Sequence, residues 1–417
     1  MQQPPPRLGP RPLPLHLGTA LLTWASSESA WQIWKRDWPS SKPSSAVPEA
    51  IAPLLAEVGA LESHAGAGQF EAALHREIGR RLERLAEGVL AYRRHPFHRE
   101  LENPPSVWSE GGTRLLDYGT VHRPARRRGA RAVLVVPSLI NRWEVLDLTA
   151  EKSLIRALAS AGLRPYLVDW GAPGGEERGF DLAAYVARLG RALAFVVRRA
   201  RRAPIVMGYC MGGTMAVALT QLYPRRIAGL ALLAAPWDFH ADKAGHAFLL
   251  AAGPLLARLA DQTGELPVDI LQTLFWSLDP WLAVKKFARF LGLDQAGEPA
   301  HEFVLLEDWL NDGAPLAGPV ARECLLGWYG DNLPGRGQWQ VAGKRIVPRK
   351  ITRPSLIMIP SGDRIVPPLS AAALADPKHG LRKATRIDVP LGHIGMVVSG
   401  RARELCWTPL IDWLKAR

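Results

Sequence analysis

The feature that most constrains this fold is a regular alternation of short apolar segments and amphipathic helical segments between about residues 107 and 237. Runs typical of strands lie at 114–122, 131–140, 164–171, 204–210 and 227–237, and helical spacing of apolar residues lies at 151–162, 181–200 and 211–224. Strands that alternate with helices need crossover connections, which produce a largely parallel sheet covered on both faces. The pattern therefore predicts an α/β fold.

The alternation stops after Trp237 for roughly a hundred residues. Helical patterns rich in tryptophan replace it, and strand patterns resume at 354–363 and 384–393 before a last helix at 405–417. We therefore expect a domain over 107–417 with a helical cap inserted at about 238–348.

The first 106 residues have a different composition. Residues 1–50 are rich in Pro, Ser and Trp, and we expect a flexible Pro-rich N-terminal arm there. Residues 51–106 carry apolar residues at helical spacing, which predicts a helical region with two helices. The apolar stretch near the N-terminus is short and interrupted by proline, so we expect neither a signal peptide nor a transmembrane segment.

Charge and cysteine content exclude some classes of function. The 52 Lys and Arg against 39 Asp and Glu favour anionic partners, but the cations are scattered and no nucleic-acid reading module is recognisable, so we expect no nucleic-acid partner. The three cysteines lie far apart and outside metal-ligand spacing. We expect no metal and no cofactor, and a cytoplasmic protein.

The segment Gly208-Tyr-Cys-Met-Gly212 has the spacing of a nucleophile elbow, GxSxG, with cysteine in place of serine. It lies between a predicted strand and a predicted helix, as that motif requires. The N-terminus of the helix favours a thiolate at Cys210, and the N–H of Met211 can donate to an oxyanion. A second oxyanion donor is expected in the loop after the strand at 131–140, at Leu139 or Ile140.

A catalytic cysteine needs a base, and the base needs a group that orients it. Asp363 follows the predicted strand at 354–363, and His393 follows the one at 384–393. Each residue alone has an ordinary structural interpretation, as a core cysteine, a turn aspartate or a buried histidine. The order nucleophile, acid, histidine at successive strand ends is that of the α/β-hydrolase fold, so we predict a catalytic triad.

Four other residues have weaker settings. Cys324 and Cys406 lie in helical stretches, and we interpret both as packing residues. Asp238 follows the strand before the cap and either lines the pocket or caps a helix. Asp169 ends a strand, where fixing a turn is the favoured interpretation over catalysis.

The motifs together resemble the polyhydroxyalkanoate synthase family, which polymerises hydroxyacyl-coenzyme A into polyester. The resemblance covers about 107–417 and lies in 136–148, 166–173, 208–216, 234–245, 361–370 and 392–402. The cap segments 274–291 and 303–332 are similar to the shorter synthases that work with a second subunit.

The resemblance implies an acyltransferase that polymerises (R)-3-hydroxyacyl-CoA and releases CoA. Cys210 would hold the growing chain as a thioester, His393 would activate Cys210 and the incoming hydroxyl, and Asp363 would orient His393. It further implies the coenzyme A thioester as substrate and the surface of a polyester granule as a partner. A second synthase subunit or a second copy of the chain is the implied protein partner.

Two other functions stay open. One is hydrolysis by the same triad, as a thioesterase or an intracellular polyester depolymerase. The other is a catalytically silent protein that coats granules through its arm and basic surface, although silence would leave a complete triad without a purpose.

Overall fold

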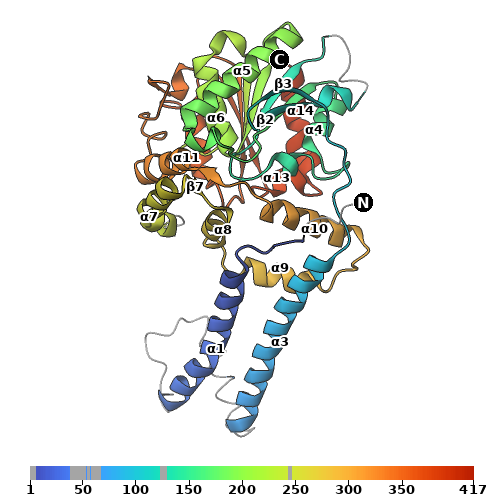
Figure 1. Ribbon diagram of the computed structural model, residues 1–417, viewed down its shortest axis with the longest axis vertical. Coiled ribbons are helices and arrows are strands. Elements are labelled where there is room, and N and C mark those ends of the chain that lie inside the picture. Colours follow the sequence, from blue (N-terminus) through green and yellow to red (C-terminus); the bar gives the residue numbers. More distant parts are fainter. Residues whose placement is uncertain (1–5, 38–52, 54–56, 58–66, 123–128, 243–246) are drawn as a thin grey trace. The chain divides into compact units, whose positions relative to one another are not determined.

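The computed structural model describes residues 6–37, 53, 57, 67–122, 129–242 and 247–417 (Figure 1). The chain divides into two compact units. The helical unit comprises Met1–Phe97 and Asp279–Val304, and the sheet unit comprises His98–Leu278 and Leu305–Arg417.

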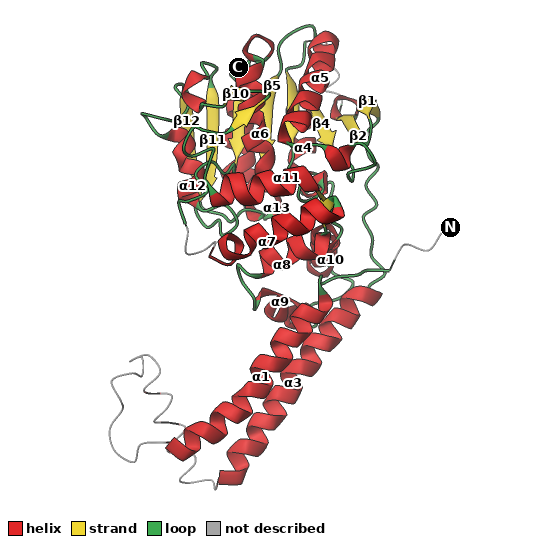
Figure 2. Cartoon of the chain, turned by 60° about the vertical axis from the view of Figure 1, so that its left-hand side comes forward, coloured by secondary structure: helices red, strands yellow, loops and turns green. Residues whose placement is uncertain are grey.

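An eight-stranded sheet forms the centre of the sheet unit, with the order β1-β2-β4-β3-β5-β6-β11-β12 (Figure 2). Its strands are β1 (Ser106–Glu110), β2 (Thr113–Asp117), β3 (Ala132–Val136), β4 (Arg164–Asp169), β5 (Ile205–Tyr209), β6 (Gly229–Leu233), β11 (Ser355–Pro360) and β12 (Ala384–Val389). β2 pairs antiparallel with β1 and β4, and all the other neighbours pair parallel. The predicted α/β fold with a mostly parallel sheet is confirmed.

The two faces of this sheet bury different side chains. Along β3, Leu134 and Val136 pack in one apolar cluster, whereas Val133 and Val135 pack in another. The first cluster includes side chains of α5 (Leu182–Ala200) and α6 (Met211–Leu222), and the second includes side chains of α4 (Leu154–Ser160) and α14 (Thr408–Lys415). Because successive strand residues point to opposite faces, continuously apolar strands such as β3 need helices on both sides.

The insertion between β6 and β11 is mainly helical. In the sheet unit it contains α7 (Ala247–Thr263), β7 (Glu265–Leu266), α8 (Val268–Trp276), β8 (Leu316–Ala317), α11 (Gly318–Arg322), the π-helix η6 (Glu323–Gly330), β9 (Gln340–Val341) and β10 (Lys344–Arg345). β7 pairs with β8 and β9 with β10, both antiparallel. α12 (Pro368–Ala372) and α13 (Gly395–Val398) follow β11 and β12.

The helical unit contains α1 (Leu13–Asp37), α3 (Ala67–Arg94), α9 (Leu282–Phe290) and the start of α10 (Glu298–Asn311). Its core includes Leu85, Tyr92 and Phe287. α3 and α9 pack closely because residue 88 is glycine: a Cβ there would lie 2.4 Å from the carbonyl oxygen of Phe287. The unit therefore has an apolar core of its own.

Two expectations about domain organisation are corrected. Residues 13–37 form a helix and not an irregular arm. The proline cluster ends at Pro14, in the first turn of α1, where proline is tolerated.

Residues 279–304, which we expected in the cap, cluster instead with the N-terminal residues, because α9 packs on α3. Two helices were expected over 51–106, and α3 is one of them. Residues 51–66 lie outside the described residues, apart from residues 53 and 57.

Candidate active site

Cys210 lies in the turn between β5 and α6, with φ 55° and ψ −131°. A positive φ is uncommon for a residue that carries a Cβ and marks a strained, over-determined position. The Cys210 N–H donates to the carbonyl of Leu233 on β6 at 2.9 Å. The sheet therefore fixes the backbone of this residue on one side, and α6 begins directly after it.

The glycines around Cys210 are required by close backbone contacts. A Cβ at Gly208 would lie 2.5 Å from the Cα of Gly213. A Cβ at Gly213 would lie 2.4 Å from the Cβ of Ala235. Strand β5, helix α6 and the segment after β6 thus converge where no side chain fits, which is the physical reason for the elbow's glycine pattern.

Gly212 allows the loop after β3 to approach the start of α6. A Cβ at this residue would lie 2.2 Å from the carbonyl oxygen of Val136 and 2.4 Å from that of Pro137. The indole Nε1 of Trp170 donates to the Pro137 carbonyl at 3.1 Å, from the turn that follows β4. The loop expected to supply an oxyanion donor is therefore held directly beside the elbow.

Asp363 and His393 lie at the ends of β11 and β12, and their side chains meet. Nδ1 of His393 lies 2.6 Å from Oδ2 of Asp363. The other carboxylate oxygen, Oδ1, accepts hydrogen bonds from the N–H groups of Ile365 and Val366, both at 2.8 Å. The Asp363 side chain is fully buried and that of His393 is 8% exposed. The carboxylate is thus fixed by its own turn and in turn orients the imidazole.

The charge of Cys210 acts on His393, whose side chain contacts Asp363. The assignment of these three residues as a catalytic triad stays a prediction. Burial lowers the pKa of His393, but the charge of Cys210 and the hydrogen bonds to Asp363 and Cys210 outweigh burial and raise that pKa from 6.5 to about 10. An imidazolium beside the sulfur favours an ion pair of the kind that activates cysteine nucleophiles.

Sequence reasoning missed the role of Tyr209, the residue directly before Cys210. Its hydroxyl donates to the backbone carbonyl of His393 at 3.1 Å, and the two rings lie 5.2 Å apart. Burial and the charges of Cys210 and Asp363 raise the pKa of Tyr209, so the hydroxyl keeps its proton. The sequence did contain a signal for this role, because Tyr209 places a hydroxyl group inside the elbow, directly before Cys210.

The oxyanion donors are partly distinguished by the loop geometry. Met211 is the first residue of α6, where backbone N–H groups have no intrahelical acceptor. The N–H of Ile140 donates to the hydroxyl of Ser138 at 3.1 Å, whereas the N–H of Leu139 has no protein acceptor among the described residues. Because the Ile140 donor is engaged, Met211 and Leu139 are the pair we retain as candidates.

The two weaker aspartates have structural partners. Oδ1 of Asp238 accepts from the N–H of His240 at 2.9 Å and from the amide of Asn332 at 2.7 Å. Asp169 accepts from the N–H of Gly171 at 3.1 Å and pairs with Arg114 at 2.6 Å. These contacts fit turn-fixing roles for both residues.

The other two cysteines are buried thiols. Burial raises the pKa of Cys406 to about 12, and burial followed by the charge of Glu323 raises the pKa of Cys324. Neither thiol has a setting that favours the nucleophilic thiolate. Among the described residues, no group of three or more His, Cys, Asp or Glu could hold a metal ion.

The inserted segment contributes aromatic side chains to the apolar cluster against which Cys210 packs. Tyr329 lies on the π-helix η6, and burial together with the charge of Cys210 raises its pKa. Its ring contacts that of Phe239 at 5.0 Å, and Trp328 contacts Phe239 at 5.2 Å. Helical spacing alone did not identify Tyr329, because the π-helical turn changes which face a residue occupies.

Comparisons with known proteins identify relatives of this chain. The sequence model of the family described as alpha/beta hydrolase fold matches residues 131–399. The chain is 30% identical over 319 residues to the poly(3-hydroxyalkanoate) polymerase subunit PhaC of Haloarcula marismortui, a match that covers 75% of this chain and 67% of the relative.

Two further proteins that carry the same name are similar to the chain. The one from Synechocystis is 29% identical over 295 residues, which are 68% of this chain and 78% of the relative. The one from Haloferax mediterranei is 28% identical over 327 residues, and the match covers 75% of this chain but only 63% of the relative's length. In the described part of the chain, no helix is long and apolar enough to span a membrane.

Proposed function

The chain belongs to the poly(3-hydroxyalkanoate) polymerase family within the α/β-hydrolase fold, and from this premise we propose that it polymerises (R)-3-hydroxyacyl-CoA with release of CoA. The observation that carries the proposal is the arrangement at one edge of the sheet. Cys210 lies in a strained turn with a positive φ, its charge raises the pKa of His393, and Nδ1 of His393 lies 2.6 Å from Oδ2 of Asp363. This arrangement suits covalent acyl transfer.

In the first step, the Cys210 thiolate attacks the carbonyl carbon of the substrate thioester. The negative charge that develops on the carbonyl oxygen is stabilised by the N–H groups of Met211 and Leu139. The carbon–sulfur bond to CoA then breaks, and the His393 imidazolium gives its proton to the departing CoA thiolate. Thioester exchange leaves the acyl group on Cys210 and a neutral imidazole at His393.

In the second step, the hydroxyl of a further hydroxyacyl group attacks the acyl-enzyme. Neutral His393 takes the hydroxyl proton, an ester bond forms, and the bond between the acyl carbon and Cys210 breaks. The sulfur leaves as thiolate beside the regenerated imidazolium. Asp363 keeps the imidazole oriented through both steps without giving up its charge.

Water is the competing acceptor in the second step. Phe239 and Trp328 belong to the apolar cluster against which Cys210 and Tyr329 pack. These aromatic residues support transfer over hydrolysis, because a dry pocket protects a reactive acyl-enzyme. A thioesterase or a polyester depolymerase would use the same triad and remains the second candidate.

The partners that we propose follow from the family. Several relatives are named as polymerase subunits, and we propose a second synthase subunit as the protein partner and the polyester granule as the working surface. We place the protein in the cytoplasm, where reducing conditions keep the thiol of Cys210 available. The CoA thioester is the substrate, and the proposed chemistry uses no other cofactor.

The test follows free CoA and turbidity together after addition of 3-hydroxybutyryl-CoA, with and without a candidate partner subunit. Release of CoA with polymer is expected, and release without polymer would establish a hydrolase in its place. Cys210→Ala should form no acyl-enzyme with a substrate analogue, whereas Cys406→Ala, which removes a buried thiol outside the predicted triad, should still be labelled. Equal labelling of the Cys210→Ala variant would overturn the assignment of the nucleophile.

A further inference from the structure

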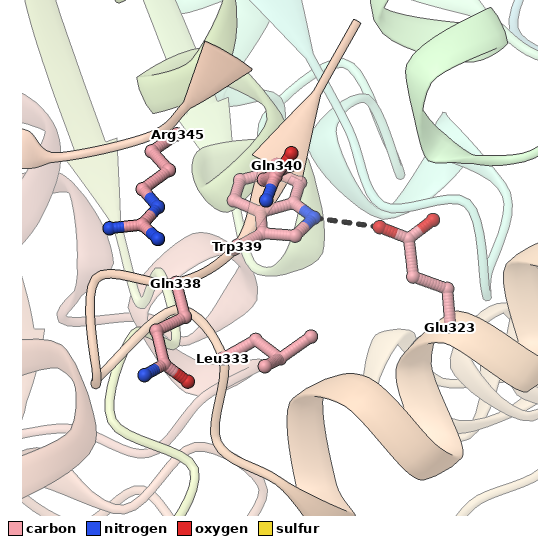
Figure 3. Close-up of a pocket in the computed structure, with 6 residues that line it drawn as sticks. All are labelled: Glu323, Leu333, Gln338, Trp339, Gln340 and Arg345. Carbon is pink, nitrogen blue, oxygen red and sulfur yellow. Dashed lines mark hydrogen bonds between the residues drawn. The ribbon is translucent and has the colours of Figure 1, made fainter. Parts of the chain in front are cut away.

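A pocket of about 460 Å³ lies beside the β9–β10 hairpin (Figure 3). Its lining residues are Glu323, Leu333, Gln338, Trp339, Gln340 and Arg345. Cys210, Asp363 and His393 are not among them, so the pocket is separate from the acyl-transfer site. Its volume is in the range of sites that bind small molecules.

Hydrogen-bond donors without protein partners line this pocket. Arg345, Gln338 and Gln340 are exposed, and their guanidinium and side-chain amides have no hydrogen-bond partner among the residues that the structure describes. A guanidinium presents a planar array of donors that matches carboxylate and phosphate oxygens. The donor set therefore suits an oxyanion.

The backbone that carries Arg345 is held in place. The side-chain amide of Gln221 donates to the Arg345 carbonyl at 2.8 Å, and the same side chain accepts from the N–H of Val347 at 2.7 Å. The hairpin turns through Ala342 and Gly343, both with positive φ. A pocket wall fixed from α6 in this way is preorganised for a ligand.

The surrounding sequence is strongly cationic. Between Asp331 and Asp363 the sequence contains no Asp or Glu, and its Lys and Arg residues are Arg336, Lys344, Arg345, Arg349, Lys350 and Arg353. All of these except Arg353 are exposed. Such a surface raises the local concentration of anions and attracts them into a nearby cleft.

The single carboxylate in the lining is already engaged. Glu323 accepts from the indole Nε1 of Trp339 at 2.7 Å and from the N–H of Leu182 at 3.3 Å. Burial raises the pKa of Glu323. The hydrogen bond from Trp339 lowers that pKa but is the smaller effect. In Figure 3 the indole of Trp339 lies between Glu323 and Arg345, so the carboxylate does not neutralise the guanidinium.

We propose that this pocket binds a small, multiply charged anion, a phosphate ester or a polycarboxylate, at Arg345, Gln338 and Gln340. The inference rests on the pocket, its unpartnered donors and the cationic surface, and it does not depend on the acyl chemistry.

Isothermal titration calorimetry on the full chain tests the proposal, with inorganic pyrophosphate and citrate as probes at constant ionic strength set by NaCl. Saturable binding of one probe is expected, and the tighter of the two identifies the ligand as a phosphate ester or a polycarboxylate. Arg345→Gln should weaken binding at least tenfold. Gln338→Glu, which places a carboxylate in the pocket, should weaken it as well and serves if the first variant fails to fold.

Lys344→Gln is the matched control, because Lys344 is exposed on the same strand and does not line the pocket. It should change the dissociation constant less than threefold. Absence of saturable binding, or equal weakening by Lys344→Gln and Arg345→Gln, would overturn the proposal. Anion binding is also measured in the Cys210→Ala variant without acyl substrate. Its outcome therefore does not depend on whether the chain acts as a polymerase.

Discussion

Nδ1 of His393 and Oδ2 of Asp363 lie 2.6 Å apart, although the two residues lie in turns that follow different strands, β11 and β12. The contact forms because β11 and β12 pair parallel and in register, so that their carboxyl ends meet at one edge. It fixes the imidazole ring with its other nitrogen available for Cys210. The catalytic predictions below depend on this orientation.

Asp363→Asn should reduce the rate of acyl-enzyme formation by about 10²–10⁴-fold, because an amide no longer holds the imidazole in the productive tautomer and charge state. The rate of CoA release in a single turnover measures the effect. Asp388→Asn is the control, since Asp388 is exposed on β12 and pairs with Arg386. A similar loss in both variants would contradict the role of Asp363.

Gly212→Ala should destabilise the protein by about 1–3 kcal/mol, the usual range for overpacking, because its Cβ would overlap the carbonyl oxygens of Val136 and Pro137. Acylation should fall as well, since the loop with Leu139 must move away from α6. Denaturant unfolding and CoA release measure the two effects. Gly79→Ala in α3, where an added Cβ meets nothing within 4 Å, should retain both stability and activity. An unchanged Gly212→Ala enzyme would show that this loop approach is not required.

Tyr209→Phe should slow acylation about tenfold, because the backbone of His393 loses its hydrogen bond from the tyrosine hydroxyl. The cost in unfolding free energy should be about 0.5–1.5 kcal/mol, as for a typical hydrogen bond. Tyr223→Phe is the control, because it removes a tyrosine hydroxyl at the C-terminal end of α6, the opposite end from Cys210. If Tyr209→Phe lowers stability and leaves the acylation rate intact, Tyr209 supports the fold without positioning the base.

The pH dependence of stability should report the environment of His393. Its pKa is raised to about 10 in the folded protein, so its favourable contribution is fully present below the unfolded value of about 6.5 and is lost as pH rises through about 10. Cys210→Ser removes the charge that raises this pKa most, so the loss should begin at a lower pH. Denaturant unfolding between pH 6 and pH 10.5 compares the two proteins. Identical pH profiles would contradict the coupling between Cys210 and His393.

Local patterns predicted the sheet unit well because its elements carry their own signals. β3 is apolar at every position, and a strand covered on both faces must be. The elbow was recognisable because a cysteine between glycines follows a strand and begins a helix. The helical unit was harder: α1 begins inside a proline-rich stretch, and the packing of α9 on α3 joins segments that are far apart in the sequence.

The sequence by itself determined the succession of strands and helices in the sheet unit and the glycine positions that the elbow needs, and it led to the prediction of Cys210, Asp363 and His393 as the triad. Each of these depends on neighbours along the chain. Only the tertiary structure decided that Tyr209 holds the backbone of His393, that Ser138 engages the N–H of Ile140 and that Arg345 faces a pocket with unpartnered amides. Those relationships depend on how loops pack and which donors find acceptors, and sequence spacing does not specify either.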